Sequence, residues 1–174
     1  HRGAQSSMDI SADLQELAQT PVTVICAGAK AILDIPRTLE VLETHGVPVI
    51  AYGQDDFPAF WSRGSGLGAP LRMGSAEDIA RAAETRAAMG LSGGQLVANP
   101  IPQEYEIAQE VIGPIIEAAL DEAEAQGIKG KAVTPFLLDH IFRATDGASL
   151  TANIALVLNN ARLGAGIARA LAGK

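Results

Sequence analysis

Short apolar runs alternate with longer amphipathic segments along this chain, and this pattern predicts its secondary structure. The first run, residues 22–26, is nearly all apolar and rich in β-branched side chains, which is typical of a parallel strand covered on both faces. Runs at residues 47–51 and 95–98 predict two further strands. Pro48 favours an edge position or a strand start for the second run, because proline donates no hydrogen bond to a neighbouring strand.

Segments with apolar residues three or four positions apart predict helices between and after these runs. Ser75 begins a capping box, Thr134 precedes a proline, and Gly46 and Gly90 follow the last apolar positions of their segments. A stretch rich in glycine, proline and aromatic residues, 52–71, is typical of an ordered loop. The helices are predicted at residues 9–18, 31–44, 75–89, 103–126 with a bend at Pro114, 134–144, and 149–171 with Ser149 as its cap.

The alternation of strands and helices predicts an α/β fold with helices on both faces of a sheet. We expect a three-layer α/β/α arrangement with a mixed, largely parallel central sheet. At 174 residues the chain is long enough for one sizeable core. Since no break in composition divides it, we expect a single domain over residues 1–174.

Composition excludes some classes of function. The net charge of −7 argues against a nucleic-acid-binding surface, and no apolar stretch approaches the roughly 18 residues of a membrane span. Cys26 is the only cysteine, so no disulfide can form within the chain. These features favour a reducing, cytoplasmic setting.

Lys30 stands where the first strand should run out into a loop, after Ala27, Gly28 and Ala29. In open α/β sheets, ligands bind beyond the carboxyl ends of the strands. An amine among apolar neighbours there can lose hydration and serve as a Schiff-base nucleophile. The same local pattern also fits a lysine that opens an exposed helix, and by itself it favours that reading.

Polar residues gather at the chain start, where His1, Asp9, Ser11 and Asp13 occur. Asp9 and Asp13 are four positions apart, so their carboxylates would share one face of a helix. Together with a hydroxyl they could bind a hard cation such as Mg²⁺ or Mn²⁺. The alternative is a helix N-terminus at which acidic residues interact only with the dipole and free N–H groups.

Asparagines form a third polar group. Asn99 follows the third strand, and the last helix carries Asn153, Asn159 and Asn160, although asparagine is mildly unfavourable in helices. Asn153 and Asn160 should share a face, with Asn159 pointing elsewhere. For any single asparagine, hydrogen bonding between helices is the simpler explanation.

Many short blocks along the chain carry a family resemblance. They are residues 1–4, 9–17, 26–34, 46–50, 52–53, 57–60, 98–102, 128–131, 133–137, 153–156 and 159–162. In these blocks, and so over essentially its whole length, the chain resembles the pseudouridine-5′-phosphate glycosidase family, also called indigoidine synthase A-like proteins.

This resemblance implies reversible cleavage of the C–C glycosidic bond of pseudouridine 5′-phosphate, giving uracil and ribose 5-phosphate. The bond joins two carbons, so protonation of a leaving oxygen by a carboxylic acid is not available. An imine between a lysine and C1′ of the opened sugar supplies an electron sink instead. Lys30 matches the Schiff-base lysine of the family.

The resemblance also implies roles for the residues at the chain start. Asp9 matches the aspartate that holds Mn²⁺, one ion per subunit and largely through water molecules. Ser11, Ala12 and Asp13 match a segment that contacts the substrate. His1 and Asn153 are implied to be neighbours of the metal and the sugar phosphate, and so to take part in substrate binding.

Family members are homotrimers and extend well upstream of the position that matches His1. That upstream part carries a proton-donating glutamate and a basic group for the phosphate. We therefore expect the chain to be the C-terminal portion of such an enzyme, and a separate N-terminal fragment of the same protein is one candidate partner. Two alternatives remain open at this point: another Schiff-base sugar-phosphate enzyme of the same fold, or a non-catalytic interaction domain.

Overall fold

A computed structural model describes residues 1–30, 32–128 and 132–173 and has a four-stranded sheet at its centre. The α/β class is confirmed, and all three strand pairings are parallel. Within the described residues, the antiparallel pairings are isolated bridges outside the strands, so the expected admixture of antiparallel strands is not found there. The sheet order is β1 (Thr23–Cys26), β4 (Gln95–Ala98), β2 (Val49–Tyr52) and β3 (Leu71–Met73).

Positions in the sheet differ in part from the sequence expectation. The first strand, β1, is an edge strand of the described sheet, and Val24 in it is 37% exposed. The expectation of a strand covered on both faces is therefore wrong for β1. Pro48 immediately precedes β2, an inner strand, so it marks a strand start. The short strand β3 lies mainly exposed and was not predicted.

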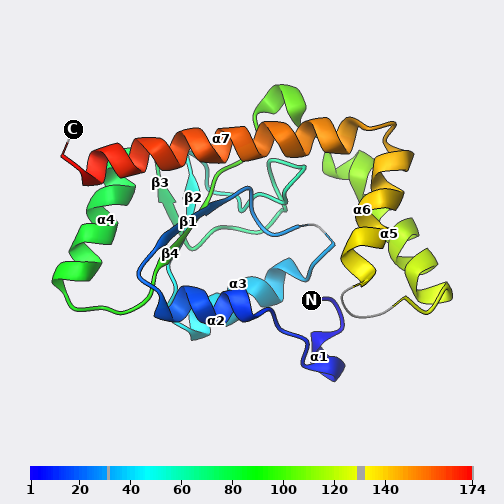
Figure 1. The fold of residues 1–174 in the computed structure, drawn as a ribbon, viewed down its shortest axis with the longest axis horizontal. Coiled ribbons are helices and arrows are strands. Elements are labelled where there is room, and N and C mark those ends of the chain that lie inside the picture. The colour runs from blue at the N-terminus through cyan, green and yellow to red at the C-terminus, as the bar shows by residue number, and fades with distance from the viewer. Residues whose placement is uncertain (31, 129–131, 174) are drawn as a thin grey trace.

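Helices cover both faces of the sheet, as Figure 1 shows. On one face lie α2 (Ala12–Gln19) and α3 (Ile35–Thr44). On the other lie α4 (Ala76–Ala88) and the long α7 (Ala148–Leu171), which crosses the whole molecule. The predicted three-layer arrangement is thereby confirmed.

Strand side chains alternate between two separate cores, as the period of two in a strand requires. In β4, Leu96 and Ala98 belong to a core with Leu42 of α3. Val97 between them points to the opposite face and packs with Ile167 of α7. This alternation explains why β4 is apolar at consecutive positions.

The order of the strands accounts for the two helical layers. The connection from β1 through α3 to β2 crosses the sheet in one direction, and that from β3 through α4 to β4 crosses it in the other. Because crossovers between parallel strands are right-handed, opposite directions place the helices on opposite faces. The second crossover also inserts β4 beside β1.

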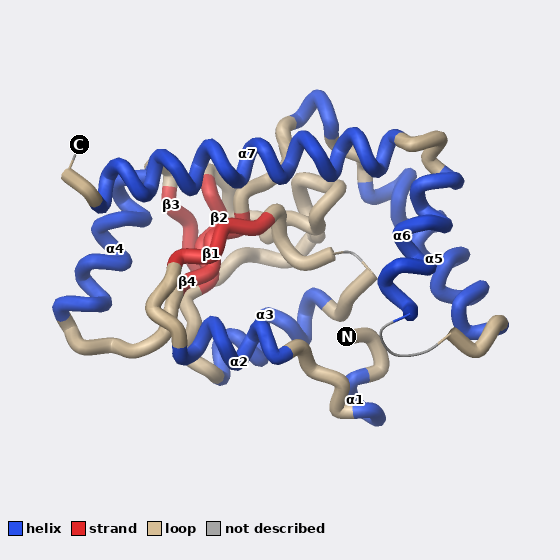
Figure 2. The backbone as a smooth tube through the Cα atoms, in the orientation of Figure 1, coloured by secondary structure: helices blue, strands red, loops and turns tan. Residues whose placement is uncertain are grey.

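A further core lies beyond the carboxyl end of the sheet, where α5 (Gln109–Ala125) and α6 (Val133–Ala144) pack with the first half of α7. Loops connect this region to the sheet, as Figure 2 shows. Trp61 and Ile101 from these loops are buried in the core. Two short elements, α1 (Ala4–Ser7) and η1 (Gln103–Tyr105), complete the described secondary structure. None of the helices within the described ranges combines the length and apolar character needed to cross a membrane.

Helix starts proved harder to predict than helix ends. Ser75 caps α4 as predicted, its hydroxyl accepting from the Asp78 N–H. The helix expected over 31–44 begins only at Ile35, capped by Asp34, while residue 31 lies outside the described ranges. The one expected from residue 103 begins at Gln109 and continues through Pro114.

The last two helices, in contrast, begin one residue earlier than predicted. The helix expected from Thr134 starts at Val133. Ser149 does not cap the last helix: Gly147 occupies that position, in a left-handed conformation. The Ser149 N–H instead donates to the Thr145 hydroxyl at 3.2 Å. The tight turn between the helices therefore determines where α7 begins.

Candidate active site

Lys30 lies in the loop that leaves the carboxyl end of β1. The Asn99 N–H, at the end of neighbouring β4, donates to the Cys26 carbonyl at 2.7 Å. Both loops therefore start at the same edge of the sheet, where α/β proteins bind ligands. Lys30 is half-buried and precedes α3 by several residues, so it does not open that helix.

A second loop supports the loop that carries Lys30. Gly28 forms an isolated antiparallel bridge with Ala59, and the Phe60 N–H donates to the Ala27 carbonyl at 2.9 Å. These contacts bring the Phe60 ring under the lysine, whose Nζ lies 5.9 Å from the ring centroid. A cation within about 6 Å of an aromatic face is attracted by it. The amine of Lys30 thus lies over an aromatic ring, near the outer limit of a cation–π contact.

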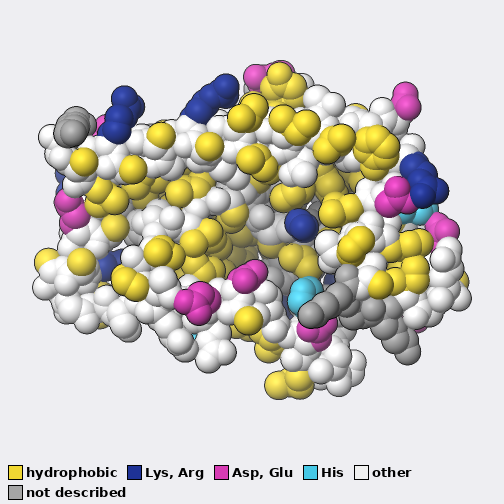
Figure 3. Space-filling view, in the orientation of Figure 1, with side chains coloured by type: hydrophobic (Ala, Val, Ile, Leu, Met, Phe, Trp, Pro, Cys, Tyr) yellow, Lys and Arg dark blue, Asp and Glu magenta, His cyan; other side chains and the backbone are white. Residues whose placement is uncertain are grey.

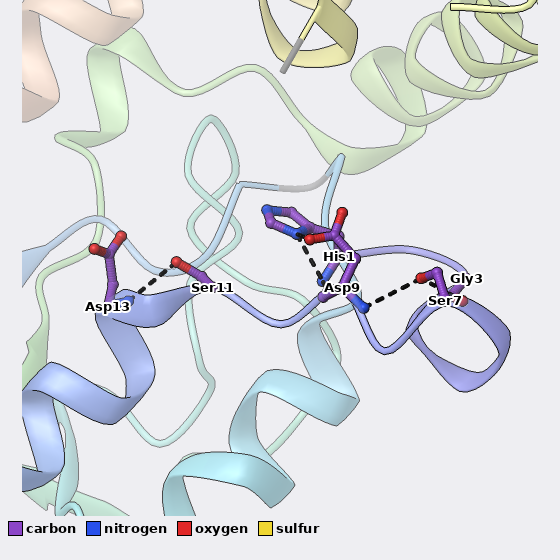
Figure 4. Close-up of polar contacts among 6 residues, drawn as sticks. All are labelled: His1, Gly3, Ser7, Asp9, Ser11 and Asp13. Carbon is purple, nitrogen blue, oxygen red and sulfur yellow. Dashed lines mark hydrogen bonds and ion pairs between the residues drawn. The ribbon is translucent and has the colours of Figure 1, made fainter. Parts of the chain in front are cut away.

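His1 and Asp9 form the polar pair nearest the chain start, as Figure 4 shows. His1 Nδ1 lies 3.2 Å from Asp9 Oδ1, and the Asp9 side chain is 60% exposed. Asp9 lies before α2, which begins at Ala12. The expectation that Asp9 and Asp13 share a helix face is therefore wrong.

Ser11 is the N-cap of α2. Its hydroxyl oxygen accepts from the Asp13 N–H at 3.2 Å, and Asp13 lies in the first turn. This geometry fits the capping explanation for both residues. The side chains of Ser11, Asp13 and Asp9 nevertheless lie along the same side of this segment in Figure 4, and a capping hydroxyl keeps its own hydrogen for a ligand.

The side chains of Asp9 and His1 could together hold a metal ion that is largely hydrated. Within the described ranges, no group of three or more histidine, cysteine or acidic side chains is arranged to hold a metal ion. Asp9 offers one exposed carboxylate, with the His1 imidazole beside it. Such a pair is suited to a hard divalent ion that keeps most of its water ligands, and not to an ion enclosed by protein ligands.

Two asparagines of α7 are hydrogen-bonded to the segment that follows β4. The Asn99 side-chain amide, in a residue only 4% exposed, donates to Asn160 Oδ1 at 3.1 Å. Asn159, expected to point elsewhere, donates to the Pro100 carbonyl at 3.1 Å. Asn159 and Asn160 are therefore hydrogen-bonded as expected, but to the segment that follows β4 and not to another helix. Asn153 lies nearer the start of α7 and is half-buried beside Ala152, a residue of the core formed with α5 and α6.

The molecule is hollowed between α7 and the layer of α2 and α3, as the space-filling view in Figure 3 shows. Two cavities adjoin the N-terminal segment, with volumes of about 490 Å³ and about 620 Å³. They share Asp34 and Pro36; the smaller reaches Ala59 and the larger reaches His1. Their volumes are in the range of small-molecule sites. Lys30 lines neither cavity.

Cys26, at the end of β1, is a free thiol. Burial raises the pKa of the Cys26 thiol to about 11, and a backbone hydrogen bond from Gly28 opposes the rise. A thiol with a raised pKa is a weak nucleophile near neutral pH. Cys26 therefore belongs to the packing beneath the site, and Lys30 is the better candidate nucleophile.

Residues 1–170 match the family described as "Indigoidine synthase A like protein". The chain belongs to this family. The resemblance found in the short sequence blocks is confirmed by this match.

Its relatives include enzymes named pseudouridine-5′-phosphate glycosidase. The chain is 70% identical over 172 residues to that of Paracoccus denitrificans and 68% identical over 171 residues to that of a Jannaschia species. These alignments cover 99% and 98% of the chain. It spans only 57% of the length of each relative.

Two solved structures share the fold. Prealnumycin C-glycosynthase AlnA, in complex with ribulose 5-phosphate, matches with a TM-score of 0.92 and 35% identity over 99% of the chain and 57% of its own. An indigoidine synthase A-like protein from Thermotoga maritima matches with a TM-score of 0.82 and 37% identity, over 92% of the chain and 53% of its own.

Sequence reasoning missed two partners of the site. Phe60 lies in the stretch 52–71, which was predicted only as an ordered loop, yet its ring faces Lys30. Phe57 and Trp61 are buried plugs, 0% and 2% exposed. Asn99 was noticed only as a polar residue after a strand. The adjacency of β1 and β4, which brings Asn99 beside the lysine loop, has no local sequence signal.

Proposed function

We propose that this chain forms the lysine-bearing part of an enzyme that reversibly cleaves the C–C glycosidic bond of pseudouridine 5′-phosphate. The products are uracil and ribose 5-phosphate. The observation that carries the proposal is the position of Lys30 beyond the carboxyl end of β1, in a chain 70% identical to an enzyme with that activity in its name. The whole activity is a proposal because the chain spans 57% of that relative.

The reaction requires a nucleophile that can later act as an electron sink. The Lys30 amine attacks C1′ and displaces the ring oxygen O4′, which takes up a proton, so the sugar opens. The nitrogen lone pair then forms a C1′=N double bond and expels C5 of the uracil ring, which is protonated in turn. Water adds to the resulting iminium and releases ribose 5-phosphate and the free amine.

The other candidate residues surround this step. Ser11, Ala12 and Asp13 at the start of α2, with His1 and Asn153, are proposed to contact the sugar phosphate. Asp9 is proposed to hold a single Mn²⁺ largely through water molecules, which the exposed carboxylate beside His1 suits. When bound, the ion would supply positive charge close to the substrate. We assign the proton donor and the main phosphate-binding group to the upstream part of the family's sequence.

We further propose a cytoplasmic homotrimer. The free Cys26 thiol fits a reducing compartment. An exposed apolar stripe on one face of α7, formed by Leu150, Ile154, Val157 and Leu158, fits an interface with other protein surface. Either a second subunit or the remaining part of a longer chain could cover this stripe. Sedimentation analysis of the 174-residue chain and of the longer protein distinguishes these two possibilities.

Trapping of the imine tests the proposed function. The protein, at its natural length and with Mn²⁺, is incubated with ribose 5-phosphate and sodium borohydride, and the labelled lysine is located by mass spectrometry of peptides. We expect the label on Lys30. In a separate assay with pseudouridine 5′-phosphate, we expect Lys30→Arg to release no uracil. The chain has three other lysines, Lys129, Lys131 and Lys174. Label on one of these, or none at all, contradicts the proposal, and Lys129→Arg serves as the matched control.

A second candidate is the formation of a C-glycoside with an acceptor other than uracil. The match to AlnA, named a C-glycosynthase and solved with ribulose 5-phosphate, favours this alternative. Its identity of 35% is half that of the Paracoccus relative. Condensation of uracil with ribose 5-phosphate to pseudouridine 5′-phosphate supports the first candidate. Lys30 labelling without that condensation supports the second.

A further inference from the structure

We infer that Phe60 takes part in the reaction, because its ring face stabilises the positive charge that Lys30 bears as a protonated imine. This inference rests on the proposed function, because it assigns a role in the lysine chemistry to a residue outside the nucleophile. Lys30 Nζ lies 5.9 Å from the centroid of the ring. The atom that would join the sugar is therefore the atom that faces the ring.

The ring is held in this place by unusual backbone geometry. Phe60 has a φ of +66°, in the left-handed region that residues with side chains rarely adopt. Its N–H donates to the Ala27 carbonyl at 2.9 Å, which ties it to the loop that carries Lys30. Backbone strain of this kind persists only where the surroundings enforce it, and it is concentrated at functional sites.

Neighbouring aromatic contacts fix the plane of the ring. Phe60 meets Trp61 edge to face, with centroids 5.0 Å apart and planes at 87°. Trp61 is buried, and its Nε1 donates to the Ser149 carbonyl at the start of α7 at 3.1 Å. A ring supported in this way can offer its face to Lys30 with little loss of side-chain freedom. This arrangement is more than the packing of a hydrophobic plug requires.

The ring can act in one step of the reaction, the departure of the uracil carbon. The uracil carbon leaves as the lysine nitrogen becomes an iminium, so positive charge grows at Nζ and C1′ in that step. An aromatic face stabilises a cation but gives little to a neutral amine. Because the ring is in place before the substrate arrives, it needs no rearrangement when the charge develops.

Fluorinated phenylalanines at position 60 test this inference. Each added fluorine withdraws electron density from the ring face while its shape changes little. We compare phenylalanine with the mono-, tri- and pentafluoro analogues in the natural-length protein. The measurement is the amount of ribose 5-phosphate trapped on Lys30 by cyanoborohydride, which reduces the protonated imine. We expect a stepwise decline, to about three- to tenfold less for the pentafluoro ring.

Phe57 is the matched control, because it belongs to the same loop and is buried in the core beside α3. The same analogues at position 57 should leave trapping unchanged, with thermal unfolding measured for every variant. If trapping is constant across the series at position 60 while the unsubstituted protein is labelled, the inference is wrong and the proposed function stands. If the unsubstituted protein is not labelled, both are wrong.

Discussion

The backbone of Gly28 lies against the carbonyl group of Pro58, so closely that a Cβ on Gly28 would be 1.7 Å from the Pro58 oxygen. Gly28 also has a φ of +87°. The loop that carries Lys30 can therefore approach the loop that carries Phe60 only because residue 28 has no side chain. The close approach of these two loops is what gives the lysine its aromatic neighbour.

Gly28→Ala should both destabilise the protein and misplace the lysine. We expect a loss of more than about 2 kcal/mol in the free energy of unfolding, since the left-handed conformation alone costs about 1–2 kcal/mol and the clash with Pro58 adds to it. Urea denaturation measures this loss. Imine trapping on Lys30 should also fall at temperatures where the variant is still folded.

Gly66→Ala provides the control for that experiment. Gly66 has a φ of +76°, but a Cβ there would meet no atom within 4 Å. Its cost should be confined to the conformational term of about 1–2 kcal/mol, with trapping unchanged. Equal losses in the two variants would show that the contact with Pro58 contributes nothing.

The Asn99–Asn160 hydrogen bond should contribute to the attachment of α7. Asn99→Ala removes the donor to Asn160 Oδ1 at a position that is only 4% exposed. We therefore expect a loss of about 1–3 kcal/mol in the free energy of unfolding. Asn160→Ala should cost a similar amount. The double variant should cost less than the sum, because removing both partners leaves no unsatisfied group.

Asn153→Ala combined with Asn99→Ala is the comparison pair, since no hydrogen bond joins these two described residues. Their effects on chemical denaturation should add. Additivity in the Asn99–Asn160 pair as well would contradict a direct energetic contact between these two side chains.

Stability should decline at alkaline pH because of Cys26. Its folded-state pKa is raised from 9.0 to about 11 by burial, so the unfolded chain loses the thiol proton first. The contribution of the Cys26 thiol to the free energy of unfolding is therefore constant below about pH 9 and is lost as the pH rises through about 11. The slope approaches at most about 1.4 kcal/mol per pH unit within that window.

Cys26→Ala isolates this contribution from the other groups that titrate at high pH. The difference in unfolding free energy between the natural protein and the variant should be constant from pH 7 to about 8 and should shrink by pH 10. A difference that does not vary with pH would mean that the thiol is not shielded from water in the folded protein.

Asp9→Asn should weaken Mn²⁺ binding by about tenfold or more, because the carboxylate is the only acidic group beside His1 that we assign to the ion. Electron paramagnetic resonance of free Mn²⁺ measures the affinity without any dependence on turnover. Glu84→Gln, an exposed residue on α4, removes the same charge elsewhere and should leave affinity unchanged. Identical affinities in the two variants would exclude Asp9 as the metal ligand.

Local signals in the sequence were sufficient for the main elements. β4 begins and ends where its apolar run does, and Ser75 caps α4, because both depend on neighbours in the chain. Position 30, which follows an apolar run, could likewise be recognised as lying in the loop beyond a strand. The start of α3 was predicted too early, although Asp34 as the cap and Pro36 in the first turn are local signals of the same kind.

Features that depend on distant parts of the chain were not predictable. The strand order places β4 beside β1, and thereby Asn99 beside the lysine loop. The positive φ of Phe60 accompanies its hydrogen bond to Ala27, which belongs to a loop far earlier in the chain. Neither has a signature in the residues next to it.

By itself, then, the sequence determined the α/β class, most of the strands and helices, the family, and Lys30 as the candidate nucleophile. These follow from hydrophobic period, capping and ordered blocks of residues, all of which are local. Only the tertiary structure decided that Lys30 faces Phe60 and that Asn99 joins the sheet to Asn160. The physical reason is that such contacts arise when packing of the layers brings separate segments together.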